Sequence, residues 1–198
     1  MSWSLEQVTA PDESVVSIVD AKLHLRVDHD DEDTLIERIV DACTERAEMY
    51  QLRAYGTQTF RLVLPRFPSG RLILLPRPPL QSVTSITYTD TDDAEQTLST
   101  DVYRVDTASE PGRVILNTDE SWPDTATEPD AVKIEYVAGY GNAVPAAERS
   151  AVLLLVGHLY ENRETVTVGS GPTFRIPMGP EYLLAPNRVF PLDPLGES

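Results

Sequence analysis

Several features that mark other classes of protein are scarce or missing in this chain of 198 residues. Its one cysteine, Cys43, excludes an internal disulfide framework and a cysteine-rich zinc site. The N-terminus lacks the basic and apolar regions of a signal peptide, and the longest apolar run, 151–156, is far shorter than the roughly 20 residues of a membrane-spanning helix. With 41% hydrophobic and 24% charged residues, we expect a globular protein that is neither secreted by that route nor embedded in a membrane.

Positive charge is also scarce. The chain has 32 acidic and 16 basic residues, a formal net charge of −16, and its only lysines are Lys22 and Lys133. A surface so rich in carboxylates does not bind phosphate non-specifically. Two explanations stay open, adaptation to a salty host cytoplasm and a role beside DNA to which the protein must not adhere.

Residue groups that support catalysis are missing. A nucleophile needs a base within hydrogen-bonding reach, and the chain offers only His24, His29 and His158. His158 lies in a leucine-rich helical segment, where a packing or interface role is expected, and Cys43 falls on the apolar side of a helix. The chain has no G-x-S-x-G, H-E-x-x-H or C-x-x-C motif. We therefore expect no enzymatic activity.

Two other patterns suggest a bound ligand and fail on spacing. The acidic run 28–33 resembles the start of a calcium loop, but such a loop would need glycine at position 33 and glutamate at 39, where the chain has Asp33 and Ile39. We interpret these carboxylates as capping the next helix and opposing its dipole. The glycines at 139 and 141 lack the third glycine of a phosphate loop and are interpreted as a turn. The sequence thus predicts no metal site and no cofactor.

Hydrophobic periodicity predicts helices at both ends of the chain. A capping box at Ser17 and Asp20 predicts a short helix over 17–27, with Val19 and Leu23 on its apolar side. Apolar residues at three- and four-residue steps predict an amphipathic helix over 31–52, ended by Gly56. A third helix is expected from Pro145 to position 164.

Between these helices the period changes to two, which is typical of strands. Phe60, Leu62 and Leu64 alternate with residues of the opposite face, and turn residues separate the later runs. The expected strands cover 57–64, 71–75, 82–89, 97–105, 113–116 and 131–137. Short strands with such turns favour a small antiparallel sheet or a barrel-like sandwich.

The fold class expected is α+β, a helical body with an inserted antiparallel β-domain and an extended, proline-rich tail. The helices at the two ends must pack on each other to bury their apolar faces. The expected division is 1–56 and 141–164 for the helical body, 57–140 for the β-domain and 165–198 for the tail. We expect the tail to become ordered on a partner.

The only basic stretch consists of Arg61, Arg66, Arg71 and Arg77. A nucleic-acid site would combine these with stacking aromatics, for which Phe60 and Phe67 are available. The intervening prolines and the net charge favour contact with an acidic protein partner instead.

The order of short motifs resembles that of the head-tail connector (adaptor) proteins of tailed phages and prophages. The match starts with KLHLRVDHDDEDTLI at 22–36 and the helix ending in EMY at 48–50. It continues, in order, with LPRPPLQSV at 75–83, ITYTD at 86–90, YRV at 103–105, SWP at 121–123, YVAGYG at 136–141, VP at 144–145 and LYENRE at 159–164. The tail matches loosely, and the scarcity of lysine departs from the usual member.

This resemblance implies a structural virion protein, assembled in the host cytoplasm and placed at the head-tail interface. It implies a homo-oligomeric ring, commonly of twelve copies, that contacts the portal protein and the next neck or tail protein while DNA passes through without specific binding. The rival hypotheses are an acidic DNA mimic that inhibits a nucleic-acid enzyme and a small hydrolase, the latter disfavoured by the missing catalytic groups.

The expected contacts with the portal or a neighbouring subunit lie at the end of the last helix and in the tail. Arg163 lies near the negative end of the helix dipole, where two interpretations stay open: its guanidinium forks onto a neighbour's carboxylate, or the helix end is solvated. The tail carries apolar side chains too numerous to leave in water. The full expected set is Glu161, Asn162, Arg163, Phe174, Arg175, Ile176, Tyr182, Leu183, Leu184, Arg188 and Phe190.

Overall fold

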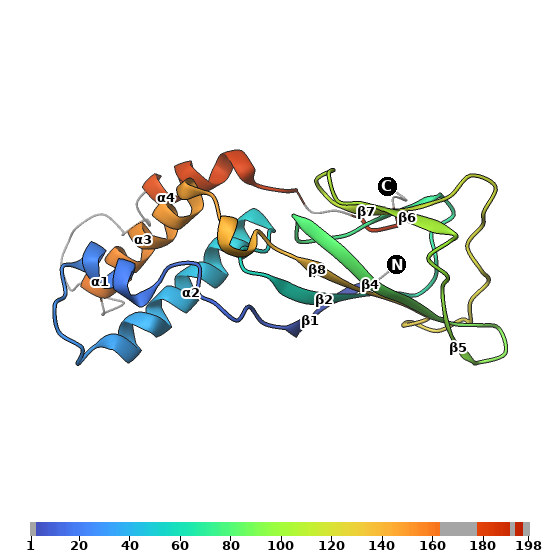
Figure 1. Ribbon diagram of the computed structural model, residues 1–198, viewed down its shortest axis with the longest axis horizontal. Helices are drawn as coiled ribbons and strands as arrows, with labels where there is room; N and C mark the ends of the chain where they lie inside the picture. Colours follow the sequence, from blue (N-terminus) through green and yellow to red (C-terminus); the bar gives the residue numbers. More distant parts are fainter. Residues whose placement is uncertain (1–2, 163–177, 191–192, 196–198) are drawn as a thin grey trace, which may run out of the picture. The chain divides into compact units, whose positions relative to one another are not determined.

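The computed structural model describes residues 3–162, 178–190 and 193–195, and confirms the α+β fold class (Figure 1). The chain divides into two compact units. The β unit comprises residues 1–12, 52–141 and 190–198, and the helical unit comprises residues 13–51 and 142–189.

The β unit contains two antiparallel sheets. The five-stranded sheet has the order β1-β2-β8-β4-β5 and the three-stranded sheet the order β3-β7-β6. The strands of the first are β1 (Ser4–Thr9), β2 (Gln58–Leu64), β8 (Val132–Ala138), β4 (Leu80–Thr89) and β5 (Glu95–Thr97). Those of the second are β3 (Leu72–Leu74), β7 (Arg113–Leu116) and β6 (Tyr103–Asp106).

The core of the β unit follows from the alternation in β2. Its residues Phe60, Leu62 and Leu64 are buried, and in the register of β8 they lie opposite Tyr136, Ile134 and Val132. They share one apolar cluster with residues of the smaller sheet such as Ile73 and Val114. Each such side chain contributes about 1.5–3 kcal/mol by leaving water, so the predicted strand pattern accounts for the core.

Two further features belong to this unit. Leu195 is buried in the same apolar cluster, and the amide of Leu74 donates to the carbonyl oxygen of Pro194 at 3.2 Å. Gly139 has a φ of +124°, and a Cβ there would lie 2.0 Å from the carbonyl oxygen of Gly56. A side chain at position 139 is therefore sterically excluded, in keeping with the expected turn.

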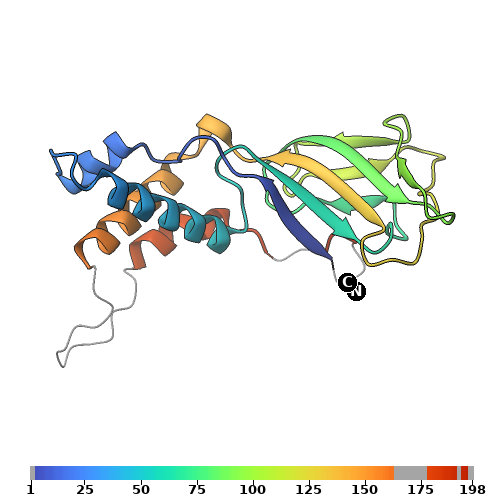
Figure 2. The ribbon, with the colours of Figure 1, turned by 90° about the horizontal axis from the view of Figure 1, so that it is seen from below.

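The helical unit contains α1 (Ile18–Leu25), α2 (Asp33–Gln51), α3 (Ala146–Glu161) and α4 (Met178–Leu184). Two short 3-10 helices, η1 (Gly141–Ala143) and η2 (Ala185–Asn187), precede α3 and follow α4. The capping box is present, because the Ser17 hydroxyl oxygen accepts the amide of Asp20 at 3.0 Å. The predicted packing of the terminal helices is confirmed, since α2 packs on α3, seen in Figure 2 as the blue helix beside the orange one.

The structure differs from the predicted elements in several places. Neither β1 nor α4 was predicted; β1 is an edge strand with mostly exposed residues, so it lacks the alternation that marks a half-buried strand. The run 97–105 is divided between β5 and β6, because a turn begins at Ser99, whose carbonyl oxygen accepts the amide of Val102. Helix α2 stops at Gln51, and Leu52, with a φ of +57°, makes the turn expected at Gly56.

Candidate assembly interface

Exposed apolar side chains gather on the helical unit. Among the described residues, six large apolar side chains of this unit are exposed: Val19, Leu23, Met49, Leu154, Leu159 and Tyr182. In the β unit the exposed ones are Val8 and Phe190. Such side chains, when clustered, mark protein interaction sites.

The largest exposures lie on α1. Val19 and Leu23 stand four residues apart on one face of the helix and are 70% and 78% exposed, although the sequence pattern had placed them on a buried face. Ala21 is the buried residue of this short helix. Leu23 also lines a cavity of about 430 Å³ between α1 and α3, together with Val15, Val16 and Leu153.

A second apolar site lies on α2. Met49 is 60% exposed and lines a shallow cavity of about 460 Å³ with Ala42, Glu45, Arg46 and Tyr50. The predicted buried stripe of α2, which includes Val40 and Cys43, lies on its other side.

The segment 178–189 is bound to α2 and α3 through buried polar groups that the sequence analysis missed. Glu148 is fully buried, and its Oε1 accepts a hydrogen bond from Asn187 at 2.6 Å and a longer one from Gln51 at 3.4 Å. Gln51 also donates to the carbonyl oxygen of Leu184 at 2.7 Å, and its own carbonyl oxygen accepts the amide of Val189 at 2.8 Å. These bonds fix the position of α4 and η2 on the helical unit.

The expected interface residues at the end of α3 are exposed. Glu161 is the last residue of α3, and Asn162 caps it, with its side-chain amide donating to the carbonyl oxygen of His158 at 2.9 Å. Four members of the expected set, Arg163, Phe174, Arg175 and Ile176, lie outside the described residues.

The other expected residues of the tail have different surroundings. Tyr182 and Phe190 are 81% and 74% exposed, whereas Leu184 is buried and Leu183 is half-buried. The guanidinium of Arg188 lies 5.0 Å from the centre of the Tyr50 ring, a cation–π contact within the helical unit. Tyr182 and Phe190 therefore present the largest apolar surfaces of this set to a partner.

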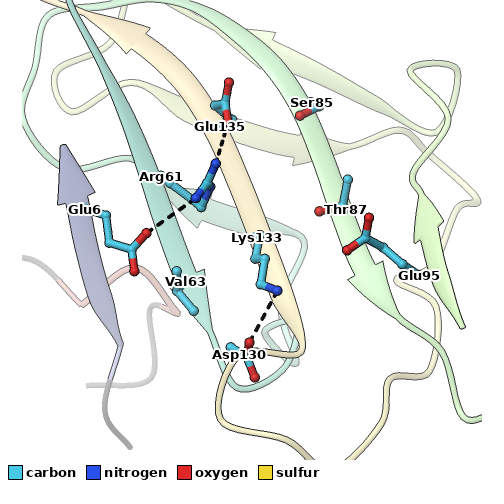
Figure 3. A pocket seen from close by; sticks show the side chains of 9 residues that line it. All are labelled: Glu6, Arg61, Val63, Ser85, Thr87, Glu95, Asp130, Lys133 and Glu135. Carbon is cyan, nitrogen blue, oxygen red and sulfur yellow. Dashed lines mark hydrogen bonds and ion pairs between the residues drawn. The ribbon is translucent and has the colours of Figure 1, made fainter. Parts of the chain in front are cut away.

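The four arginines of the basic stretch are spread over the β unit. Arg61, in β2, lies between Glu135 at 3.2 Å and Glu6 at 3.6 Å (Figure 3). Arg71 donates to the carbonyl oxygen of Leu116 at 2.7 Å, while Arg66 and Arg77 lie in the connections on either side of β3.

Figure 3 shows the outer face of the larger sheet, where Lys133 also pairs with Asp130 at 3.3 Å. The cavity there, of about 550 Å³, is lined by both signs of charge. The charge of Arg61 is thus largely neutralised by its own sheet.

The acidic run before α2 acts locally. Lys22 pairs with Asp30 at 2.5 Å and with Asp33 at 2.8 Å. The hydrogen bond to Asp30 raises the pKa of Lys22, and the same bond lowers the pKa of Asp30. Within the described part of the chain, no three metal-ligating side chains come together.

The last two features are the buried cysteine and the character of the helices. Cys43 is buried in α2, as predicted, and burial raises the pKa of its thiol to about 12. Of the helices that the structure describes, none has the length and apolar character needed to cross a bilayer.

Comparison with known proteins gives a family and a set of similar folds. The model of the head completion protein family matches residues 14–177. No curated protein sequence matches the chain. A chain in the neck of an empty gene transfer agent (GTA) particle with C6 symmetry has a TM-score of 0.76 and 24% identity, covering 96% of this chain and 97% of that one.

Two further solved chains have the same fold. One, from the virion of a native GTA particle, has a TM-score of 0.77 and 24% identity, over 95% of this chain and 96% of that one. The other, from the neck of a native GTA particle with C12 symmetry, has a TM-score of 0.74 and 23% identity, over 96% and 97%. The likeness extends over nearly the whole of each chain, so both units of the fold are shared.

Proposed function

The chain belongs to the head completion protein family, and on that premise we propose that it is a head-tail adaptor without catalytic activity. In this proposal, copies of the chain form a ring beneath the portal protein of the virion. The ring lets DNA pass and presents a platform to the next neck or tail protein. The family match confirms the resemblance drawn from the sequence motifs, and the similar folds from GTA necks support a place at the head-tail junction.

One observation carries the proposal: the apolar surface that a single copy of the helical unit leaves in water. Leu23, Met49 and Tyr182 are 78%, 60% and 81% exposed and lie on three different helices. Burying side chains of this size contributes about 1.5–3 kcal/mol each. A structural protein that binds neighbours on several sides requires such surfaces, whereas an enzyme requires a convergent polar site.

Tyr182 and Phe190 support the portal as the partner of the C-terminal segment. Both are exposed aromatic residues; Tyr182 lies in the bound segment 178–189 and Phe190 follows it directly in the chain. Aromatic side chains dominate the binding energy of protein interfaces. A Tyr182→Asp, Phe190→Asp double variant is expected to form rings that no longer bind the portal protein.

The acidic DNA mimic, the rival hypothesis, needs a continuous surface of unpaired carboxylates. On the outer face of the larger sheet, Glu6 and Glu135 pair with Arg61, and Asp130 pairs with Lys133. Because these carboxylates are paired, the outer face of the larger sheet does not favour the DNA-mimic hypothesis.

The test is the oligomeric state of the purified full chain, alone and mixed with the portal protein, by sedimentation and electron microscopy. We expect rings, and we expect more of them at molar salt than at low salt. With a net charge of −16 per copy, self-repulsion opposes assembly, and its range falls from about 10 Å at 0.1 M salt to about 3 Å at 1 M. A stable monomer that binds no portal and inhibits a nuclease would favour the DNA mimic instead.

A further inference from the structure

We propose that neighbouring copies of this chain join head to tail through two faces of the helical unit, with Met49 of one copy seated in the α1–α3 cavity of the next. The cavity is the one lined by Val16, Leu23 and Leu153. This inference rests on the proposed ring, because a closed ring needs two different faces on each subunit.

The two faces point away from each other. On α2, Ala42, Glu45 and Met49 each follow a buried residue of the stripe by two positions, or about 200° of helical rotation. On α3, Ser150 and Leu153 of the cavity follow the buried Glu148 and Ala151 by the same interval.

The two buried stripes face each other. Gln51, in the stripe of α2, donates a hydrogen bond to Glu148, in the stripe of α3, at 3.4 Å, and the two helices pack together. The Met49 face and the cavity therefore lie on opposite sides of the α2–α3 pair. Nearly opposite faces are what a ring of many subunits requires, since a ring of about twelve turns by only about 30° per copy.

Charge complementarity identifies a second copy as the occupant. The cavity carries Arg149 and Asp20, and the Met49 face carries Glu45 and Arg46. Among the described residues, Arg149, Glu45 and Arg46 form no ion pair within their own chain.

An arginine without an ion pair among the described residues is notable in a chain with twice as many acidic as basic residues, 32 against 16. Each face thus offers one charge of each sign around an apolar centre. Such an arrangement fixes the register between two copies and disfavours like-with-like contacts. Seating Met49 would also cover Leu23, and methionine adapts well to irregular apolar cavities.

The experiment compares the full chain with Leu23→Asp, which alters the cavity, and Met49→Asp, which alters the opposite face. Both side chains are exposed, so each variant should keep the melting temperature of the unassembled chain. We expect each variant alone to need a protein concentration at least about tenfold higher than the unaltered chain to form rings. Val8→Asp, at an exposed valine of the β unit, is the matched control and should assemble as the unaltered chain does.

Mixing the two variants tests the head-to-tail arrangement. Leu23→Asp keeps an intact Met49 face and Met49→Asp keeps an intact cavity, so an equal mixture should give a one-to-one heterodimer by native mass spectrometry. Self-association of either variant through its intact face would instead show like-with-like contacts and overturn the inference.

Exchanging two charges tests whether Asp20 of the cavity pairs with Arg46 of the neighbouring copy. Asp20→Arg and Arg46→Asp should each weaken assembly, and the double variant should restore it. If rings of the unaltered chain form and the variants at positions 23, 49, 20 and 46 also form them normally, this interface is wrong while the proposed function stands. If the unaltered chain forms no ring with or without the portal, the proposed function itself fails.

Discussion

The two units of the chain differ in how completely they bury their apolar side chains. The β unit encloses a cluster that includes Phe60, Tyr136 and Ile134 between its sheets, and its described exposed apolar side chains are Val8 and Phe190. The helical unit buries one stripe on α2 and another on α3, yet leaves six large apolar side chains in water. The helical unit therefore leaves more apolar surface for partners than the β unit, in which Phe190 is the proposed portal contact.

Both units bury polar side chains: Arg53 and Gln58 in the β unit, and Gln51 and Glu148 in the helical unit. In the β unit, Phe67 stacks on Trp122 with ring centres 4.8 Å apart, and the indole N–H of Trp122 donates to the carbonyl oxygen of Gly70 at 2.7 Å. The centre of the helical unit holds Glu148 and Gln51, fully buried and hydrogen-bonded to each other and to the C-terminal segment. Buried polar groups stabilise one arrangement because any other leaves them unpaired. In the helical unit, Glu148 and Gln51 therefore fix the position of the C-terminal segment 178–189.

The largest effect is expected from Ile134→Ala in the β unit. Ile134 is fully buried in β8 between Leu62 of β2 and Ile86 of β4, so its truncation leaves a cavity and should lower the free energy of unfolding by about 2–5 kcal/mol. The matched change in the helical unit, Leu23→Ala, should cost no more than about 0.5 kcal/mol in the unassembled chain. Urea denaturation at low protein concentration measures both. Equal losses would contradict the division between the units.

The residues of the β core could be predicted from the sequence because, in a half-buried strand, apolar residues alternate with polar ones according to which face is buried. The residues Phe60, Leu62 and Leu64 were placed on one face from the pattern alone, and the structure buries all three. Strand β1 was not predicted because most of its residues are exposed, so its sequence does not alternate between apolar and polar residues.

The helical unit was predicted less completely, because a helical pattern says which residues are apolar and not whether a partner covers them. Val19 and Leu23 fit an apolar face, but α1 has eight residues and packs through Ala21. Glu148 was missed although a signal existed: it stands three and four residues before Ala151 and Val152, in phase with the buried stripe of α3. A charged residue in phase with a buried stripe indicates a polar group with an internal partner.

A smaller effect, confined to the helical unit, is expected from Glu148→Ala. The change removes the acceptor of Asn187 and Gln51 and should cost about 1–3 kcal/mol, because it leaves buried donors without this partner. Hydrogen exchange should quicken at the amide of Val189, which is bonded to the carbonyl of Gln51. Glu37→Ala, on the exposed face of α2, is the control. Unchanged protection at Val189 would show that Glu148 does not hold the C-terminal segment.

Alkaline pH should weaken the helical unit through Cys43. Burial raises the pKa of this thiol to about 12, whereas an unfolded cysteine ionises near pH 8.5. Because the folded pKa is the higher one, the contribution to stability is fully present below about pH 8.5 and is lost as pH rises toward the folded pKa. Urea denaturation between neutral and alkaline pH should show this loss, and Cys43→Ala should reduce the dependence. Rapid reaction of the folded chain with a thiol reagent at pH 9 would contradict the burial.

The smallest effect expected is an acid-dependent one in the β unit, at Asp106. The Ser109 hydroxyl donates to Oδ2 of Asp106 at 2.7 Å and lowers the pKa of that carboxyl, and Arg113 adds a second bond to the same atom at 2.8 Å. Backbone amides of Ala108 and Ser109 bind the other oxygen, Oδ1, at 3.1 Å each, so the turn between β6 and β7 is organised around one charged group.

Since the folded pKa of Asp106 lies below the unfolded one, its contribution is present above about pH 4 and is lost as pH falls. Asp106→Asn should therefore flatten the decline in β-unit stability below pH 4, while Asp124→Asn, in an exposed loop, should leave the decline unchanged. Amide exchange in β6 and β7 reports on this unit alone, which matters because Asp30 of the helical unit also has a lowered pKa through Lys22. If both variants follow the same acid profile as the unaltered chain in β6 and β7, the turn does not depend on the charge of Asp106. In that case the difference between the units would have to rest on their apolar residues and on Glu148.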